Sequence, residues 1–177
     1  MSIIEKIRRE HQESLASLKE MSQLARHLEK GAPLKVEQVL DVVASTLDFN
    51  NRCHHFKEEK LFQLLALKLD ENEIPLLMEL EAEHKASDEL LKNINRQILQ
   101  TVPQIPLLKN RIVEILWTFV ELNRRHIDKE EKRFLPLFEG LVTRDEQVHL
   151  LEYFQPRQST GPILTLPTVS SYLSKEL

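Results

Sequence analysis

The sequence contains a single cysteine, Cys53, among its 177 residues. One cysteine excludes an intrachain disulfide and a zinc site built from several cysteines. A chain without disulfides suits a reducing compartment, so we expect a cytoplasmic protein. Cys53 itself is expected to be a small buried residue.

Glycine and long apolar runs are also scarce. The three glycines disfavour a turn-rich β architecture, and a 29% share of charged residues suits long helices. No apolar run approaches the roughly 20 residues that a membrane-spanning helix requires. Charged residues also interrupt the N-terminus too early for a secretory signal. We therefore expect an all-α protein that does not enter a membrane.

The chain has no excess of positive charge, since 24 lysines and arginines face 28 aspartates and glutamates. Proteins that bind nucleic acid usually carry a concentrated basic face, so no nucleic-acid partner is expected. One basic cluster is interleaved with acidic residues, which is typical of a solvated helix face. Its members are Arg124, Arg125, Lys129, Lys132 and Arg133.

Prolines, glycines and short polar stretches divide the chain into four long segments and a short one. Helices are predicted at 2–30, 35–69, 73–100 and 106–139, with a short fifth helix at 143–154. Short connections make successive helices antiparallel. The prediction is an up-and-down antiparallel four-helix bundle over residues 1–140. An appendage over 141–177 holds the fifth helix and an extended C-terminal tail from Gln155 to Leu177.

Each long segment carries an apolar stripe at helical spacing, and each stripe contains one histidine. These are His11, His54, His84 and His126. A lone histidine on such a stripe is usually an ordinary core residue. Counted from the turns between them, however, all four lie at the same height to within about one helical turn. Two further histidines do not belong to these stripes and are expected to face solvent: His27 and His149.

Two of these histidines begin a repeated word, because residues 54–62 and 126–134 both read H-x-x-K-E-E-K-x-F. Positions i and i+4 share one helix face, so His54 with Glu58, and His126 with Glu130, each offer a nitrogen and a carboxylate to one point. A salt-bridged surface explains the lysines of both words. It does not explain carboxylates on the apolar stripe, because a buried carboxylate without a partner is costly. A cation in the core would offset that cost.

The first word, C-H-H-F-K-E-E at residues 53–59, resembles the C-H-H-x-K-E-E word of bacterial hemerythrin-like domains. Residues 125–131 resemble the last-helix word of the same family, and Glu-His pairs at 10–11 and 83–84 fit its remaining marks. The resemblance covers about residues 5 to 138. It implies a bridged di-iron centre held by histidines and two bridging carboxylates. The ligands carried over are His11, His54, Glu58, His84, His126 and Glu130.

The third helix departs from the pattern of oxygen-carrying hemerythrins, which place H-x-x-x-H there. In this chain Asp88 lies four residues after His84. The missing histidine leaves either an open position or a substitute ligand, for which His55 is the stronger candidate and Asp88 the weaker. The departure argues against reversible oxygen carriage. Imidazole and carboxylate ligands suit iron and would also accept zinc or manganese.

The resemblance implies a non-haem protein with two iron ions that binds or senses O2, NO or peroxide, or stores iron. One alternative is a di-iron peroxidase or catalase-like enzyme, although ferritin-like enzymes usually use Glu-x-x-His. Others are a protein that repairs iron–sulfur clusters under nitrosative stress, and a metal-free helical interaction module. The fifth helix and the tail are candidates for a homodimer contact or a lid. Trp117 and Phe119 are expected in the core, where either could line the pocket beside the metals.

Overall fold

The computed structural model describes residues 2–100 and 105–154, and every regular element in these ranges is helical. The elements are α1 (Ile3–Glu29), α2 (Val36–Arg52), α3 (His54–Ala66), α4 (Ile74–Gln100), α5 (Ile105–Lys129), the π-helical η1 (Glu130–Phe134), α6 (Leu135–Leu141) and α7 (Arg144–Tyr153). The all-α class is confirmed for this part of the chain. The predicted extended tail from Gln155 lies outside the described residues.

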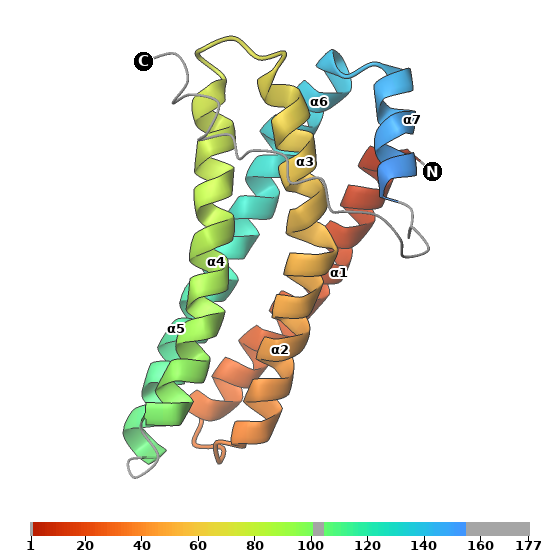
Figure 1. Ribbon diagram of the computed structural model, residues 1–177. Helices are drawn as coiled ribbons and strands as arrows, with labels where there is room; N and C mark the ends of the chain where they lie inside the picture. Colours follow the sequence, from red (N-terminus) through yellow and green to blue (C-terminus); the bar gives the residue numbers. More distant parts are fainter. Residues whose placement is uncertain (1, 101–104, 155–177) are drawn as a thin grey trace.

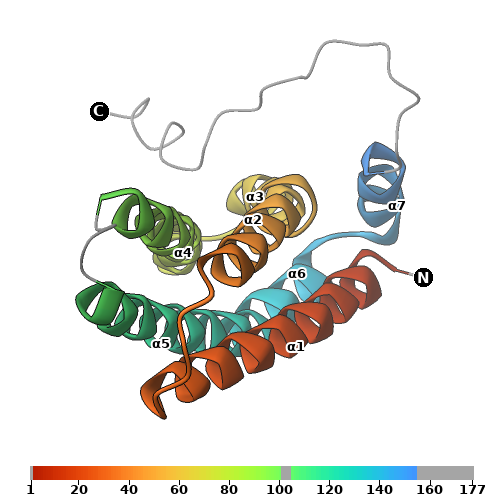
Figure 2. The same cartoon turned by 90° about the horizontal axis from the view of Figure 1, so that it is seen from below.

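The long helices lie side by side (Figure 1, Figure 2). α5 packs against both α1 and α4, α4 packs against α2 and α3, and α3 also contacts α1. Three predicted helices are confirmed with small differences at their ends: α1, α4 and α7. The other two predicted helices are each interrupted close to a repeated word.

The helix predicted over 35–69 is wrong as one element, because it breaks at Cys53 between α2 and α3. Cys53 has φ −119° and ψ −65°, away from the α-helical optimum. Two asparagines, Asn50 and Asn51, precede the break, and asparagine is a weak helix former. The expectation that Cys53 is buried is also wrong, since its side chain is exposed at this break. α3 consequently begins at His54, with the first repeated word.

The helix predicted over 106–139 is likewise wrong as one regular α-helix, because η1 separates α5 from α6. The backbone N–H of Leu135 donates to the carbonyl of Glu130, a spacing of five residues. Pro136 follows directly. Proline has no N–H and its ring clashes with the carbonyl four residues earlier, so a widened turn before it relieves the clash. The widened turn contains the second half of the repeated word.

The buried apolar residues form two clusters. One includes Leu18, Met21, Ile112 and Phe119, and the other includes Ile7, Leu61, Leu80 and Phe134. Along α1, α2–α3, α4 and α5–η1, the buried histidines and glutamates lie between members of the two clusters. A polar layer inside the bundle is thus enclosed by apolar packing on both sides. Phe119 is buried as expected, whereas Trp117 is only partly buried and donates to Glu29 at 2.9 Å.

α7 is held at its N-terminus by a capping box in which Thr143 and Glu146 each accept from the other's backbone N–H. Glu146 also pairs with Lys68 at 2.9 Å, and Leu150 and Leu151 pack on the cluster around Ile7. α7 therefore lies against the bundle. The division into domains at residue 140 stays a prediction.

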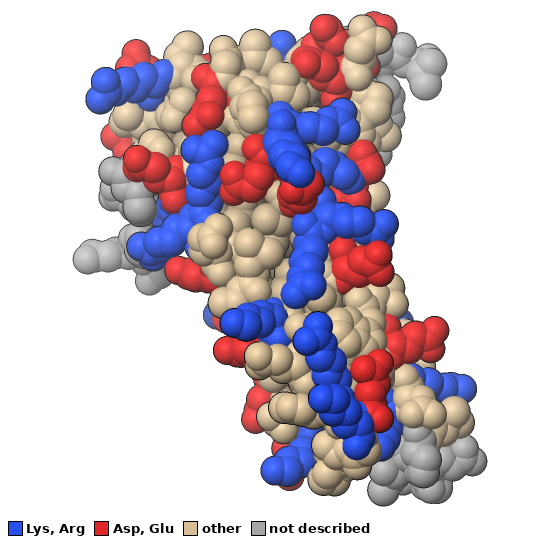
Figure 3. All heavy atoms as spheres, turned by 180° about the vertical axis from the view of Figure 1, so that it is seen from behind, with Lys and Arg blue, Asp and Glu red and all other residues tan. Residues whose placement is uncertain are grey.

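The surface carries lysines and arginines interspersed with acidic side chains, as Figure 3 shows for the face behind Figure 1. Four members of the predicted basic cluster are exposed, as expected for a solvated face: Arg124, Arg125, Lys132 and Arg133. Lys129 is the exception, with a side chain that is only 17% exposed. Within the described ranges, no helix has the length and apolar character needed to span a membrane.

Candidate metal centre

Six of the seven predicted ligands come together in the buried polar layer as two groups of four. The His11–His54 group adds Glu58 and Glu130 to those two histidines, and the His84–His126 group adds the same two glutamates. Within each group the four ligand atoms all lie within 4.8 Å of one another. All six side chains are buried, and both glutamates are fully enclosed. Two adjacent metal positions could thus share both carboxylates.

Each glutamate turns a different oxygen toward each group. Oε1 of Glu58 lies 3.2 Å from Nε2 of His11 and 3.4 Å from Nε2 of His54, whereas its Oε2 lies 3.3 Å from Nε2 of His84.

Glu130 repeats this arrangement. Its Oε2 lies 3.2 Å from Nε2 of His11, and its Oε1 lies 3.3 Å from Nε2 of His126. Each carboxylate therefore lies between the two groups, as a bridging ligand would.

The two groups come from two similar halves of the chain. One half has Glu10–His11 followed by the word at 54–62, and the other has Glu83–His84 followed by the word at 126–134. The first histidine precedes the word's histidine by 43 residues in one half and by 42 in the other. Equal spacing brings the same residue types to the same height in both halves.

Outside the two groups, carboxylates lie against the second ring nitrogen of three histidines. Nδ1 of His11 lies 2.7 Å from Glu131, Nδ1 of His126 lies 2.8 Å from Glu83, and Nδ1 of His54 lies 3.5 Å from Glu10. The two shorter contacts are hydrogen bonds, which keep the proton on Nδ1 and leave Nε2 free for a metal, whereas Glu10 is too far from His54 for one. The sequence analysis did not predict this role for the three carboxylates.

We call Glu10, Glu83 and Glu131 the outer carboxylates, and each of them is itself paired with a cation. Lys57 donates to Glu10 in a short buried contact, Lys129 donates to Glu83 at 2.5 Å, and Arg8 lies 3.3 Å from Glu131. The interpretation of Lys57 and Lys129 as solvated residues is therefore wrong. Both stand three residues after the histidine of a repeated word, and this shared offset was the signal that could have identified them.

The π-helical turn places consecutive glutamates on one imidazole. Glu130 contacts Nε2 of His11 and Glu131 contacts its Nδ1. Neighbouring residues of a regular α-helix point about 100° apart, which makes such a shared target hard to reach. η1 begins at Glu130, and π-turns often occur at functional sites.

His55 lies in the same layer but in neither group. Its ring stacks on that of His84, with centroids 3.8 Å apart, and its Nδ1 lies 3.9 Å from Asp88. Burial and the neighbouring His84 hold the pKa of His55 well below its usual value. Neither His55 nor Asp88 joins the six gathered residues. The prediction that His55 is a ligand remains untested, and this position favours its alternative, a residue that supports a ligand from outside both groups.

From this geometry, we expect His55→Ala to retain two metals per chain. The stacked ring orients His84 without supplying a donor to either group. Metal analysis of the purified variant measures this directly, with His149→Ala on the exposed α7 as the control. Loss of one metal in His55→Ala alone would restore His55 as a ligand.

Several buried polar atoms of the centre lack a hydrogen-bond partner among the described residues: Oε2 of Glu58, both oxygens of Glu130, Nδ1 of His54, Nδ1 of His84 and Oε2 of Glu10. Nε2 of His84 and Nε2 of His126 also face each other at 3.0 Å. Unpaired buried carboxylate oxygens are costly, and a cation satisfies them. The donor set of imidazole nitrogens and carboxylates therefore fits a pair of transition-metal ions.

Without a metal, the buried glutamates and histidines each favour the charged form of the other. Burial disfavours the charged imidazole of His11, but contacts with Glu130 and Glu58 outweigh burial and raise its pKa to about 11. The same opposition raises the pKa of His126 to about 10. Burial would raise the pKa of Glu58, yet the charge of His54 and contacts with His11 and His84 hold it well below its usual value. Protons thus occupy the imidazoles that metals would need.

Metal binding at pH 7 is therefore expected to release about two protons per chain, because a metal takes neutral imidazole. These protons come from His11 and His126, whose raised pKa values keep them charged at this pH. Metal affinity should accordingly rise with pH until both imidazoles are neutral, at about 11. Titration calorimetry in buffers of different ionisation enthalpy counts the protons, and a heat independent of the buffer would contradict the expectation.

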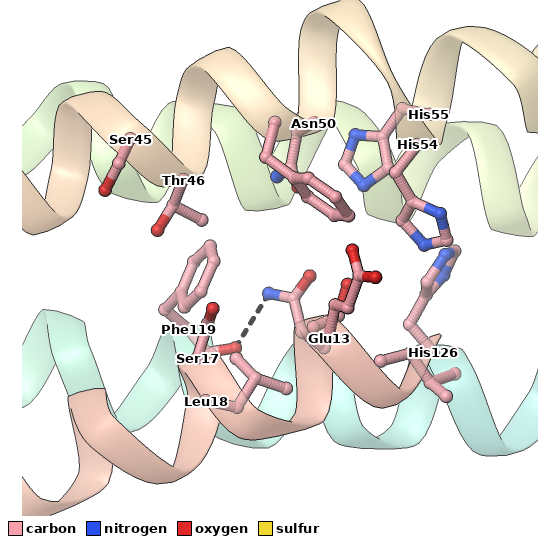
Figure 4. A pocket seen from close by; sticks show the side chains of 14 residues that line it. Glu13, Ser17, Leu18, Ser45, Thr46, Asn50, His54, His55, Phe119 and His126 are labelled. Carbon is pink, nitrogen blue, oxygen red and sulfur yellow. Dashed lines mark hydrogen bonds between the residues drawn. The ribbon is translucent and has the colours of Figure 1, made fainter. Parts of the chain in front are cut away.

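A cavity of about 270 Å³ reaches from the surface between α1 and α2 to the two groups (Figure 4). One side of it is lined by His54, His55 and His126, and the exposed side chain of Glu13 lies near these histidines. The volume holds several water molecules. Hydroxyl and amide side chains contribute to the wall: Ser14, Ser17, Ser45, Thr46, Asn50 and Asn123. A small polar molecule could reach the histidines through it.

Comparison with known proteins agrees with this geometry. The profile of the hemerythrin HHE cation binding domain matches residues 2–138, which include all six gathered residues. No curated protein and no solved structure matches the chain. A match over so much of the sequence shows that the chain belongs to the hemerythrin HHE cation binding domain family.

Proposed function

We propose that this protein binds two iron ions, with Glu58 and Glu130 bridging them. The observation that carries the proposal is the sharing of both carboxylates, each with one oxygen toward the His11–His54 group and one toward the His84–His126 group. The donor set would also accept zinc or manganese. We further infer that the long helices form an up-and-down four-helix bundle around this centre, in a cytoplasmic protein.

Iron is a redox-active ion, and it can bind a small ligand at a coordination position that the protein side chains leave open. The protein supplies four donor atoms to each ion. The apolar clusters on both sides exclude bulk water, and the outer carboxylates orient the imidazoles. We propose that O2, NO or peroxide reaches the irons through the cavity lined by His54 and His126. The protein would then act as a sensor, store or scavenger.

Turnover of peroxide is a second candidate, favoured by the polar wall of the cavity. Peroxide is a small hydrogen-bonding molecule that a wall of hydroxyls and amides can accommodate. A steady-state peroxide assay on the iron-loaded protein separates turnover from simple binding. Glu130→Ala, which removes a shared carboxylate, should abolish any turnover.

The direct test of the proposed function is metal analysis with an optical spectrum of anaerobically purified protein. We expect two irons per chain, and charge-transfer bands that change when azide or NO is added. One iron per chain, or a spectrum insensitive to both ligands, would contradict the proposal.

A further inference from the structure

We propose that the outer carboxylates make the two metal positions unequal, so that the His11–His54 group holds its metal more tightly than the His84–His126 group. Glu131 is the positioning residue responsible for the difference. This inference rests on the proposed function, because it requires two bound metals. It concerns the difference in metal affinity between the two positions. The two shared carboxylates cannot cause this difference, because each serves both positions.

The two halves agree in one outer contact. Glu10, next to His11, lies against Nδ1 of His54 and accepts from Lys57.

The matching contact in the other half has Glu83, next to His84, against Nδ1 of His126, and Glu83 accepts from Lys129. In both halves the Glu of a Glu-His pair reaches the histidine of the repeated word. The residues match, but the distances differ: Glu83 lies 2.8 Å from Nδ1 of His126, and Glu10 lies 3.5 Å from Nδ1 of His54.

The halves differ in the second glutamate of the word. Glu131 lies 2.7 Å from Nδ1 of His11. Its counterpart Glu59 is only partly buried and forms no ion pair within 4 Å of an imidazole among the described residues, although the charge of His84 acts to lower its pKa against the effect of burial. Nδ1 of His84 forms no ion pair with a carboxylate among the described residues, whereas Glu10 lies 3.5 Å from Nδ1 of His54, too far for a hydrogen bond. Both histidines of the His11–His54 group therefore have a carboxylate within 4 Å of Nδ1, at 2.7 and 3.5 Å, but only His126 of the other group does.

The packing around His84 accounts for this difference. Its ring lies between that of His55, with centroids 3.8 Å apart, and that of Phe62, with centroids 5.6 Å apart. Both neighbours are stacked on the ring and offer no carboxylate. On the other side, the π-helical turn at Glu130 brings Glu131 to His11. The word is the same, and the backbone makes its two copies unequal.

An outer carboxylate strengthens a metal-binding imidazole in two ways. It fixes the ring with Nε2 toward the metal, and its charge raises the electron density at that nitrogen. Loss of such a partner typically lowers metal affinity by about 10- to 100-fold. The His84–His126 group should thus release its metal first.

The test follows iron release from the loaded protein as a colorimetric ferrous chelator is increased under anaerobic conditions. The wild-type protein is expected to lose one iron at low chelator and the second only at roughly 10-fold higher concentration or more. Glu131→Gln should release its second iron at about 10- to 100-fold lower chelator than wild type. Its first release should stay where it is. Glu59→Gln, the same change in the other copy of the word, should behave as wild type.

Arg8→Met is a second control, because it removes the surface ion pair with Glu131 and leaves the contact between Glu131 and His11. It should keep two separate releases. A general loosening of the fold would move both releases together, so a shift of both in Glu131→Gln would overturn the inference. Equal effects of Glu59→Gln or Arg8→Met would also overturn it. Two irons released in one step from the wild type refute the inequality alone, whereas fewer than two bound irons refute the proposed function.

Discussion

Glu58→Ala is expected to lose both metals, whereas His54→Ala should lose mainly one. Glu58 offers an oxygen to each group, but His54 belongs to the His11–His54 group only. Loss of a shared carboxylate removes one donor and one negative charge from both positions at once. Metal analysis of the two purified variants gives the comparison.

Glu59→Ala is the matched control, since it removes the neighbouring carboxylate of the same word from outside both groups. It should retain two metals. The metal-free form of Glu58→Ala should melt lower than metal-free wild type, because the change removes the buried counter-charge of His11 and leaves a buried pair without one partner. Two metals in Glu58→Ala, or equal losses in Glu59→Ala, would show that Glu58 is not shared between them.

Removing the metals from the wild-type protein should lower its melting temperature by on the order of 10 °C. A ligand at 1,000 times its dissociation constant stabilises a fold by about 4 kcal/mol. A protein of this size gains roughly 2–4 °C for each kcal/mol. The unpaired oxygens of Glu58 and Glu130 lose their partner when the metal is removed. Calorimetry of the protein before and after chelation measures the shift.

Re-addition of two equivalents of ferrous iron should restore the original melting temperature. Glu58→Ala serves as the control, because a variant that binds no metal should melt at the same temperature with and without chelator. If metal-free and loaded wild type melted together, the buried carboxylates could not depend on a metal for compensation.

The positions of the six gathered residues could be predicted from local pattern alone. Spacing of i and i+4 places His54 with Glu58 and His126 with Glu130 on one helix face, whatever the rest of the fold does. Equal distances from the turns then set the four histidines at one height. These features survive small errors in helix boundaries, and the structure gathers the residues as the spacing predicted.

The helix interruptions could not be predicted in the same way. Nothing at Cys53 or Glu130 forbids a continuous α-helix locally, since neither is a proline or a glycine. The π-helical turn depends on how the backbone accommodates Pro136, and weak helix formers such as Asn50 and Asn51 do not by themselves fix where a helix breaks. Each interruption nevertheless changes the site, because Glu131 reaches His11 from the widened turn.

The outer lysines show a similar limit of sequence reasoning. Lys57 and Lys60 occupy the same word, yet Lys57 is buried against Glu10 and Lys60 is only partly buried. Alternation of glutamate and lysine is typical of a solvated face, so the pattern gives both lysines one interpretation. Only the position of α1 beside α3 separates them. His55 poses the same problem, because its neighbour His54 joins a group and His55 stacks on His84.

Anomalous diffraction at the iron edge from crystals of the loaded protein tests the shared centre most directly. The account predicts two anomalous peaks in each chain, with the carboxylates of Glu58 and Glu130 both lying between them. Four imidazoles should surround the pair, two on each peak. A single peak, or two peaks that do not share both carboxylates, would contradict it.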